Sequence, residues 1–366
     1  MQQKKCVLQI IEEGKIMFDR SIPVIGFHTL VDSGEGIDAL IRLMEEALIP
    51  KGVNTLIAEM RYQFRCFPEY SSGNVTYEDA SRLADVCEKH GVRLVPLLPS
   101  LGHQSASPAG TPLPLLEKHP EFIENNTVSK DATWPEIYHH SWCASNDGIY
   151  EYFFPMMDEI AEATRCEAFH VGLDEVFDIG MCPRCREKSP AELFARTVKI
   201  LHDHLAEKGL EMMMWGDRLL DSISMGYQMW EGDRFGMHPA LHMKDQVTRD
   251  IMICDWHYDL HSAGYPSVET FIKEGFFVMP SVFHVPENAF HFWTHALEAH
   301  YLTKRYNWPG QCGGIIFTNW TCLTNEYVDN MLLALRGEEA GDGLDAKVGK
   351  VIKRLEERAR SFKLWK

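Results

Sequence analysis

Short apolar runs alternate along the chain with longer segments in which apolar residues recur every three or four positions. The longer pattern places apolar side chains on one face of a helix, and the short runs are typical of buried strands. Glycine separates helix-like segments from the apolar run that follows at Gly52, Gly91, Gly209 and Gly275. Glycine after a helix adopts the left-handed conformation without the steric cost of a Cβ atom. Repeated helix–glycine–strand units are typical of α/β proteins with a parallel sheet.

Eight such strands with helices between them predict a (β/α)8 TIM barrel, formed as a single domain by residues 1–366. The predicted strands lie at about 22–28, 54–60, 93–98, 168–173, 212–215, 250–255, 277–282 and 314–318. A long loop insertion, about residues 100–147, follows the third strand, and its many aromatic residues argue against disorder. An open doubly wound sheet is the alternative, but no glycine-rich phosphate loop follows the first strand.

The fourth predicted strand ends in two adjacent carboxylates, Asp174 and Glu175. Successive side chains of a strand point to opposite faces, so both acids address one pocket only if the chain turns at Glu175. Barrel active sites are built at the C-terminal ends of the strands, and two carboxylates in unequal environments can divide acid and base work. The simpler interpretation is an acidic pair that opens a loop or caps the next helix.

The other strand ends bring further polar and aromatic residues to the same predicted face. They are His28, Glu59, Arg61, His103, Trp215, Asp217, Asp255, Trp256, Tyr258, His284 and Trp320. A single tryptophan is usually part of the core, but three at equivalent positions beside acids predict an apolar-walled pocket. Flat aromatic walls suit the C–H faces of a sugar ring, and polar groups suit its hydroxyls.

The strand-end motifs resemble those of one enzyme family. His170-x-Gly172-x-Asp174-Glu175 resembles the His-x-Gly-Gly-Asp-Glu signature of glycoside hydrolase family 20, the β-N-acetylhexosaminidases. The segment 99–103, Pro-Ser-Leu-Gly-His, is similar to the Pro-Gly-His end of that family's third strand. Three tryptophans fall where the family surrounds the acetamido group of its substrate, and these are Trp215, Trp256 and Trp320. The resemblance covers about residues 22–335.

The resemblance implies a retaining exo-β-N-acetylhexosaminidase that acts on N-acetylhexosamine glycosides without a cofactor. Glu175 would be the general acid and base. Asp174 would orient the substrate's 2-acetamido group, which is the nucleophile, and would stabilise the oxazolinium intermediate. Tyr258 is the candidate for hydrogen bonding to the acetamido oxygen. The other expected substrate-binding residues are His28, His103, His170, Trp215, Asp217, Trp256 and Trp320.

The sequence departs from the family pattern at three places. Leu173 occupies the position of the second glycine of the signature. Residues 26–29, Gly-Phe-His-Thr, contain no match for the first-strand arginine that holds the 3- and 4-hydroxyls. Residues 320–322, Trp-Thr-Cys, lack the acid of the family's Trp-x-Glu. Other residues would then have to bind the outer hydroxyls of the sugar. The candidates are His28, Glu59 and Arg61, together with the aromatic residues of the insertion.

Two other functions stay open. A metal-dependent hydrolase on a TIM barrel would use His28, His103 and Asp174, and a chelator would inactivate it. A non-catalytic carbohydrate-binding barrel would still bind sugar after the substitution Glu175→Gln.

The pair Cys182-x-x-Cys185 provides half of a structural zinc site. Cys143, with His139 or His140 close to it in sequence, would complete a site that joins two long loops. The alternatives are a reduced pair without function and a redox pair. No pattern predicts a catalytic metal.

The formal net charge of −17 excludes nucleic acid as a plausible partner, because such a field repels polyanions. No apolar run reaches the roughly 20 residues of a membrane span. The apolar run at 6–11 leads directly into Glu12 and Glu13, unlike a signal peptide, and the ten scattered cysteines are typical of reduced thiols. We therefore expect a cytoplasmic protein. A homodimer is compatible with the sequence, although no feature requires one.

Overall fold

The computed structural model describes residues 11–12, 15–16, 20–21, 23–106, 111–129, 131–133 and 136–361. Ile22, the first residue of the first predicted strand, lies outside these ranges. So does most of the N-terminal segment from which the cytoplasmic location is predicted.

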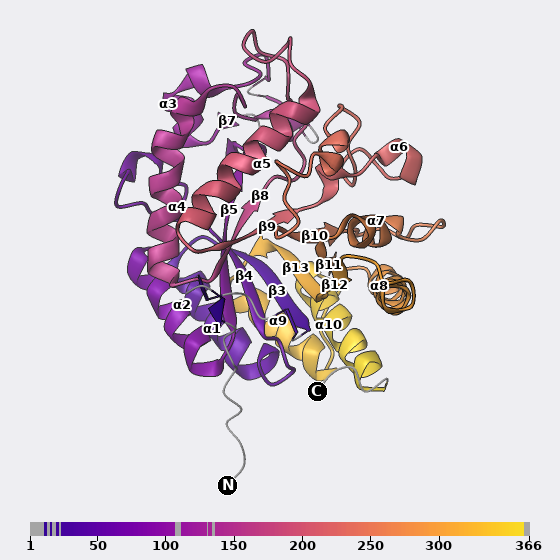
Figure 1. Ribbon diagram of the computed structural model, residues 1–366. Coiled ribbons are helices and arrows are strands. Elements are labelled where there is room, and N and C mark those ends of the chain that lie inside the picture. The colour runs from indigo at the N-terminus through magenta and orange to yellow at the C-terminus, as the bar shows by residue number, and fades with distance from the viewer. Residues whose placement is uncertain are drawn as a thin grey trace.

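Eight parallel strands form a closed barrel at the centre of the described chain (Figure 1). They are β3 (Val24–Val31), β4 (Thr55–Met60), β5 (Arg93–Ser100), β8 (Ala168–Gly172), β9 (Glu211–Trp215), β10 (Met252–Trp256), β11 (Phe277–Val282) and β13 (Gly314–Cys322). Each strand pairs with the next in this order, and β13 pairs with β3 to close the sheet. The predicted (β/α)8 barrel is therefore confirmed, and each predicted strand overlaps an observed one.

Helices surround the barrel (Figure 1). The long ones are α1 (Gly34–Leu43), α2 (Tyr77–His90), α4 (Tyr150–Thr164), α5 (Pro190–Glu207), α7 (Pro266–Glu274), α8 (Pro286–Tyr306), α9 (Asn325–Arg336) and α10 (Leu344–Ser361). A π-helical turn, Met44–Leu48, extends α1. Between β9 and β10 the described chain forms only the short helix α6 (Ser222–Met225) and two 3-10 turns, Asp217–Leu219 and His238–His242.

The helix ends follow the local sequence. Thr76 and Asp79 form a reciprocal capping box at the start of α2, which satisfies backbone N–H groups that have no partner inside the helix. At the ends of α2 and α7, Gly91 and Gly275 have φ values of +67° and +102°. Both glycines therefore occupy the left-handed conformation that the sequence pattern predicts for them.

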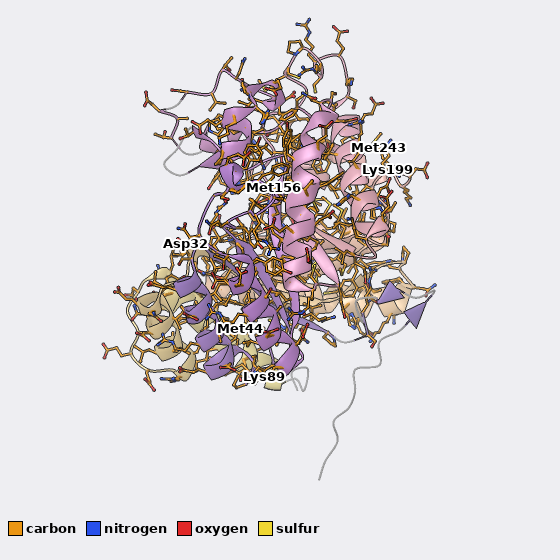
Figure 2. The ribbon with its side chains drawn as sticks, turned by 90° about the vertical axis from the view of Figure 1, so that its left-hand side faces the viewer. Asp32, Met44, Lys89, Met156, Lys199 and Met243 are labelled. Atoms are coloured by element: carbon orange, nitrogen blue, oxygen red, sulfur yellow. The ribbon has the colours of Figure 1, made fainter. Side chains whose placement is uncertain are left out.

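The apolar core has two layers. The inner layer fills the barrel with side chains from all eight strands, including Val24, Ile57, Met213, Met279 and Ile316. The outer layer lies between helices and strands and includes the buried Met44 and Met156, whereas Lys89 and Lys199 are exposed on the outer surface (Figure 2). The interior of the barrel is therefore packed with side chains and is not an open pore.

The insertion after β5 is ordered over its described residues. It contains α3 (Pro114–Lys118), the two-residue strands β6 (Ser105–Ala106) and β7 (Thr111–Pro112), and three 3-10 turns, Pro120–Phe122, Glu136–His139 and Asp147–Ile149. Trp142 is fully buried and its backbone N–H donates to the carbonyl of Leu101 at 2.9 Å. This contact joins the end of the insertion to its start, at the C-terminal end of β5.

A 3-10 turn, Pro68–Tyr70, and three other short strands complete the described elements. β1 (Ile11–Glu12) and β2 (Lys15–Ile16) form an antiparallel pair, and β12 (Gln311–Cys312) pairs with the start of β11. Of the helices that the structure describes, none combines the length and the apolar character needed to cross a bilayer.

Candidate active site

A cavity of about 940 Å³ lies at the C-terminal end of the barrel strands. Its volume is within the range of small-molecule sites. Nine of its lining residues are strand-end residues singled out from the sequence, and these are Glu59, Arg61, His103, Asp174, Glu175, Trp215, Trp256, Tyr258 and Trp320.

The two acids reach the cavity because the backbone turns sharply where β8 ends. Gly172 and Leu173 both have φ near +71°, and Glu175 has φ of +48°. The left-handed conformation costs a non-glycine residue about 1–3 kcal/mol, so surrounding contacts must hold this turn in place. It aims Asp174 and Glu175 at one cavity instead of at opposite faces of the strand. It also explains why a glycine would suit the position of Leu173.

His103 lies between the two acids. Its Nε2 is 3.1 Å from Asp174 Oδ2 and 3.1 Å from Glu175 Oε2. Burial opposes a positive charge on the imidazole, but the two carboxylates outweigh it and raise the pKa of His103 well above its usual value. Burial likewise favours the neutral form of Asp174, but His103 lowers the pKa of Asp174 below its usual value. At neutral pH the pair is therefore a carboxylate and an imidazolium.

Asp217 supports the site from behind. Its Oδ2 accepts hydrogen bonds from the backbone N–H of Glu175 (2.9 Å) and from Arg218 Nε (2.6 Å), and its Oδ1 accepts from Trp256 Nε1 (3.2 Å). Burial raises the pKa of Asp217 to about 6, with Arg218 opposing and Asp174 adding to the effect. Its side chain is 1% exposed, and Asp217 is absent from the residues that line the cavity. Asp217 therefore positions Glu175 and Trp256 by hydrogen bonds. The sequence predicts instead that Asp217 contacts the substrate directly.

Aromatic rings form one wall of the cavity. The ring centroids of Trp215 and Trp320 are 5.6 Å apart, and those of Trp256 and Tyr258 are 5.0 Å apart. The Tyr258 hydroxyl accepts a hydrogen bond from Trp320 Nε1 (2.8 Å) and lies 3.3 Å from Thr318 Oγ1. Since an indole N–H can only donate, the Tyr258 hydroxyl accepts from Trp320 and keeps its own hydrogen for Thr318 Oγ1 or for a ligand. Burial raises the pKa of Tyr258, which keeps the hydroxyl protonated.

Two predicted substrate-binding histidines lie inside the barrel, below the cavity. His28 and His170 are fully buried, and neither is among the residues that line the cavity. Their rings contact Trp215 at centroid distances of 5.6 Å and 4.6 Å. Burial lowers the pKa of each to about 3, so both are neutral. They support the tryptophan wall and have no surface to offer a sugar.

The comparison with known families covers the middle of the chain, from β4 to β10. A family model described as "Glycosyl hydrolase family 20, catalytic domain" matches residues 48–263, which is more than half of the chain.

The chain belongs to glycosyl hydrolase family 20.

Solved structures of family 20 have the same fold. A chitobiase from Flavobacterium johnsoniae is 17% identical, with a TM-score of 0.59, over 92% of this chain and 52% of its own. An exo β-N-acetylglucosaminidase from Vibrio harveyi, solved with N-acetylglucosamine, is 15% identical, with a TM-score of 0.60, over 94% and 58%. A β-N-acetylhexosaminidase from Bacteroides fragilis is 12% identical, with a TM-score of 0.60, over 94% and 70%. The family 20 chain thus spans little more than half the length of the first two, and at these identities the likeness shows the fold alone. A search of curated proteins found no match.

Several cavity residues of this family 20 chain are absent from the residues collected at the predicted strand ends. Tyr138, from the insertion, has its ring 4.7 Å from that of His103. Trp230 and Glu231 come from the loop between β9 and β10, and Glu231 Oε1 is hydrogen bonded to His257 Nδ1 (3.0 Å) and His261 Nε2 (2.8 Å). The sequence signal for Trp230 and Glu231 is an adjacent tryptophan and acid in a long loop. An analysis of strand ends alone does not include that loop.

The metal-hydrolase alternative requires His28, His103 and Asp174 to share a centre. Among the described residues, two groups with ligand atoms within 4.8 Å of one another include residues that line the cavity, and they are His103–Asp174–Glu175 and Glu231–His257–His261. His28 is not part of either group.

Proposed function

We propose that this chain is a retaining exo-β-N-acetylhexosaminidase that uses the substrate's own acetamido group as its nucleophile. The observation that carries the proposal is the turn after β8, which directs Asp174 and Glu175 into one aromatic-walled cavity. Membership of family 20 supports glycoside hydrolysis, and the N-acetylglucosamine in the Vibrio harveyi structure supports the substrate class.

Glu175 is the general acid and base. It protonates the glycosidic oxygen as the leaving group departs, and it then accepts a proton from the water that attacks the anomeric carbon. The acetamido oxygen attacks that carbon first and forms the oxazolinium intermediate. The two displacements occur on opposite faces, so the configuration is retained.

Asp174 and Tyr258 act on the acetamido group. Asp174, anionic beside His103, accepts the acetamido N–H and stabilises the positive charge that develops on the intermediate. Tyr258 donates its hydroxyl hydrogen to the acetamido oxygen and so aligns it with the anomeric carbon. Trp215, Trp256 and Trp320 enclose the methyl group and exclude water.

The outer hydroxyls of the sugar need a grip that replaces the family's missing arginine and glutamate. Glu59 and Arg61, at the end of β4, line the cavity and form an ion pair with 3.1 Å between Arg61 Nη2 and Glu59 Oε1. The guanidinium offers several donors and the carboxylate is an acceptor, which together suit vicinal hydroxyls. We assign this role to the pair.

The decisive experiment measures hydrolysis of aryl N-acetyl-β-glucosaminide and β-galactosaminide. Glu175→Gln and Asp174→Asn should each lower kcat by about 10²–10⁴-fold, since each removes a group that acts in the transition state. Glu207→Gln, an exposed position at the end of α5, is the matched control and should keep wild-type activity.

A thiazoline mimic of the oxazolinium ion separates the proposal from its competitors. It should inhibit the wild type in competition with substrate. Absence of turnover on both substrates, together with absence of mimic binding by a folded protein, would contradict the proposal. Sugar binding without turnover, unchanged in Glu175→Gln, would instead identify a non-catalytic carbohydrate-binding barrel.

A further inference from the structure

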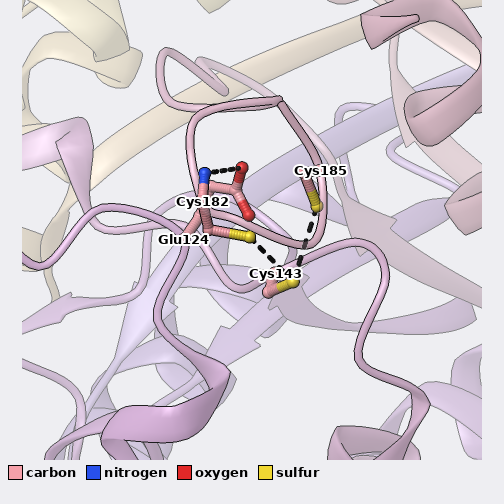
Figure 3. A group of neighbouring side chains, drawn as sticks. All are labelled: Glu124, Cys143, Cys182 and Cys185. Atoms are coloured by element: carbon pink, nitrogen blue, oxygen red, sulfur yellow. Dashed lines mark hydrogen bonds between the residues drawn. The ribbon is translucent and has the colours of Figure 1, made fainter. Parts of the chain in front are cut away.

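Three thiols and one carboxylate meet at a buried point away from the cavity lining. Cys143 Sγ lies 3.3 Å from Cys182 Sγ and 3.5 Å from Cys185 Sγ. A carboxylate oxygen of Glu124 belongs to the same group, in which all ligand atoms lie within 4.8 Å of one another (Figure 3). Glu124 and Cys143 come from the insertion after β5, and the other two cysteines come from the loop after β8.

The sulfur spacing suits a metal better than a disulfide. Zinc–sulfur bonds of about 2.3 Å at tetrahedral angles place two sulfurs about 3.8 Å apart, only slightly beyond the distances here. A disulfide requires about 2.05 Å between its sulfurs. It would also join only two of the three cysteines and leave the third beside it, whereas one metal ion accommodates all three.

Glu124 is the independent indication of a cation. Its side chain is 3% exposed, and Oε1 accepts hydrogen bonds from the backbone N–H groups of Met181 (2.6 Å) and Cys182 (3.1 Å). The other oxygen, Oε2, is buried and has no hydrogen-bond partner in the described part of the chain. A buried, unsatisfied carboxylate oxygen is costly, and a metal ion within reach would satisfy it.

We propose that Cys143, Cys182, Cys185 and Glu124 bind one structural zinc ion. Four protein ligands in a buried, closed set are typical of a structural site, because a catalytic zinc keeps one position open. Glu124 takes the place that the sequence suggested for His139 or His140. His139 Nδ1 is instead hydrogen bonded to Asp178 Oδ1 at 2.8 Å, and His140 does not belong to the group of four.

The surrounding chain is arranged to support such a site. The backbone N–H groups of Cys185 and Arg186 both donate to the carbonyl of Cys182, at 3.0 Å and 2.9 Å, which closes a tight turn between the two cysteines. Ser145 Oγ lies 3.3 Å from Cys185 Sγ and accepts a hydrogen bond from Lys188 Nζ at 2.8 Å. The lysine offsets part of the excess negative charge that three thiolates and a carboxylate leave around a divalent ion.

The zinc would join the two loops that build one side of the cavity. The loop after β8 carries Glu175 and then Asp178. Asn125 of the insertion donates a hydrogen bond from Nδ2 to Asp178 Oδ2 at 2.7 Å. The insertion carries Tyr138, whose ring contacts His103. The zinc site therefore stabilises the contact between these loops. The proposal of a zinc site does not depend on whether the chain hydrolyses glycosides.

The test measures zinc per chain in untagged, reduced protein by inductively coupled plasma mass spectrometry. Wild type should retain about one zinc per chain. Cys182→Ser should lose most of it, and Glu124→Gln should bind zinc at least about tenfold more weakly. Cys66→Ser, which removes an exposed cysteine outside the site, is the matched control and should retain the metal.

Cobalt replacement in the wild type keeps the proposal testable if a cysteine variant fails to fold. Tetrahedral cobalt with thiolate ligands should give intense thiolate-to-metal charge-transfer absorption, which Glu124→Gln should keep at saturating cobalt. Folded, reduced wild type that takes up neither zinc nor cobalt would overturn the proposal. Equal loss of metal from Cys66→Ser would overturn the assignment of ligands.

Discussion

At the scale of single residues, the candidate active site depends on polar side chains that position the acids by hydrogen bonds and ion pairs. Asp217 makes hydrogen bonds with the Glu175 backbone, Arg218 and Trp256, and so joins the end of β8, a buried cation and the aromatic wall. His103 does the same between the two acids. The chemistry proposed for Glu175 therefore relies on the two side chains that position it, Asp217 and His103.

Asp217→Asn should lower both stability and turnover. An asparagine removes the charge that balances the fully buried Arg218, and in either orientation its N–H₂ faces at least one N–H donor that Asp217 now accepts from. Removing one partner of a buried ion pair costs about 3–5 kcal/mol, and we expect the free energy of unfolding, measured with urea, to fall by about 3 kcal/mol. Among molecules that stay folded, kcat should fall more than KM changes, because Glu175 loses its backbone anchor. Asp203→Asn, on the surface of α5, is the control, and equal stability of the two variants would contradict the role of Asp217.

At the scale of elements, the turn between β8 and α5 determines where the acids point. Strand geometry alone would separate Asp174 from Glu175, and the left-handed residues at its end bring them together. Leu173 has φ of +71° yet is only 1% exposed, so burial of its side chain holds an unfavourable backbone conformation.

Leu173→Ile and Leu173→Met should separate backbone strain from burial. Both keep the side chain large and apolar, but only isoleucine is β-branched, and a β-branched residue is strongly disfavoured at positive φ. We expect Leu173→Ile to lower the free energy of unfolding by about 1–3 kcal/mol more than Leu173→Met does, and to lower kcat as the acids move. Urea denaturation and initial rates provide both measurements. Indistinguishable variants would show that the turn relaxes without strain.

At the scale of the whole molecule, the barrel and the strand-end residues were predictable, because helix periodicity, glycine punctuation and strand polarity are all local signals. Three features were not. Alternation along a strand does not say which side chains face the cavity and which lie deeper, and so His28 and His170 were placed at the ligand. Glu231 reaches the cavity from a loop without regular structure, and Glu124 reaches the three thiols from 19 or more residues away in sequence. Contacts between distant loops leave no periodic pattern to read.

The buried histidines also predict how the stability of the whole chain depends on pH. Burial lowers the pKa of His28 and of His170 to about 3, with the nearby Asp174 opposing the effect, whereas an unfolded histidine titrates near 6.5. Below pH 6.5 these two positions bind protons in the unfolded chain but not in the folded chain, so their contribution to stability falls as the pH falls toward 3. The slope contributed by each histidine is at most about 1.4 kcal/mol per pH unit.

Urea denaturation between pH 7 and pH 5 measures this dependence. Asp174 adds no slope there, because its lowered pKa lies below the window. Asp217, whose folded pKa of about 6 lies above the unfolded value, binds protons preferentially when folded and reduces the slope. Neighbouring carboxylates raise the folded pKa of His103, His202 and His257, so these histidines also bind protons preferentially when folded and reduce the slope further. His170→Gln removes one titrating group and should flatten the decline, although its stability at pH 7 falls. His242→Gln, at an exposed position, is the matched control against which the slope of His170→Gln is compared. If the slope of His170→Gln matched that of the wild type, His170 would bind protons equally in the folded and unfolded chains. It would then be charged in the folded chain at low pH, which would contradict its role as a neutral residue packed against Trp215.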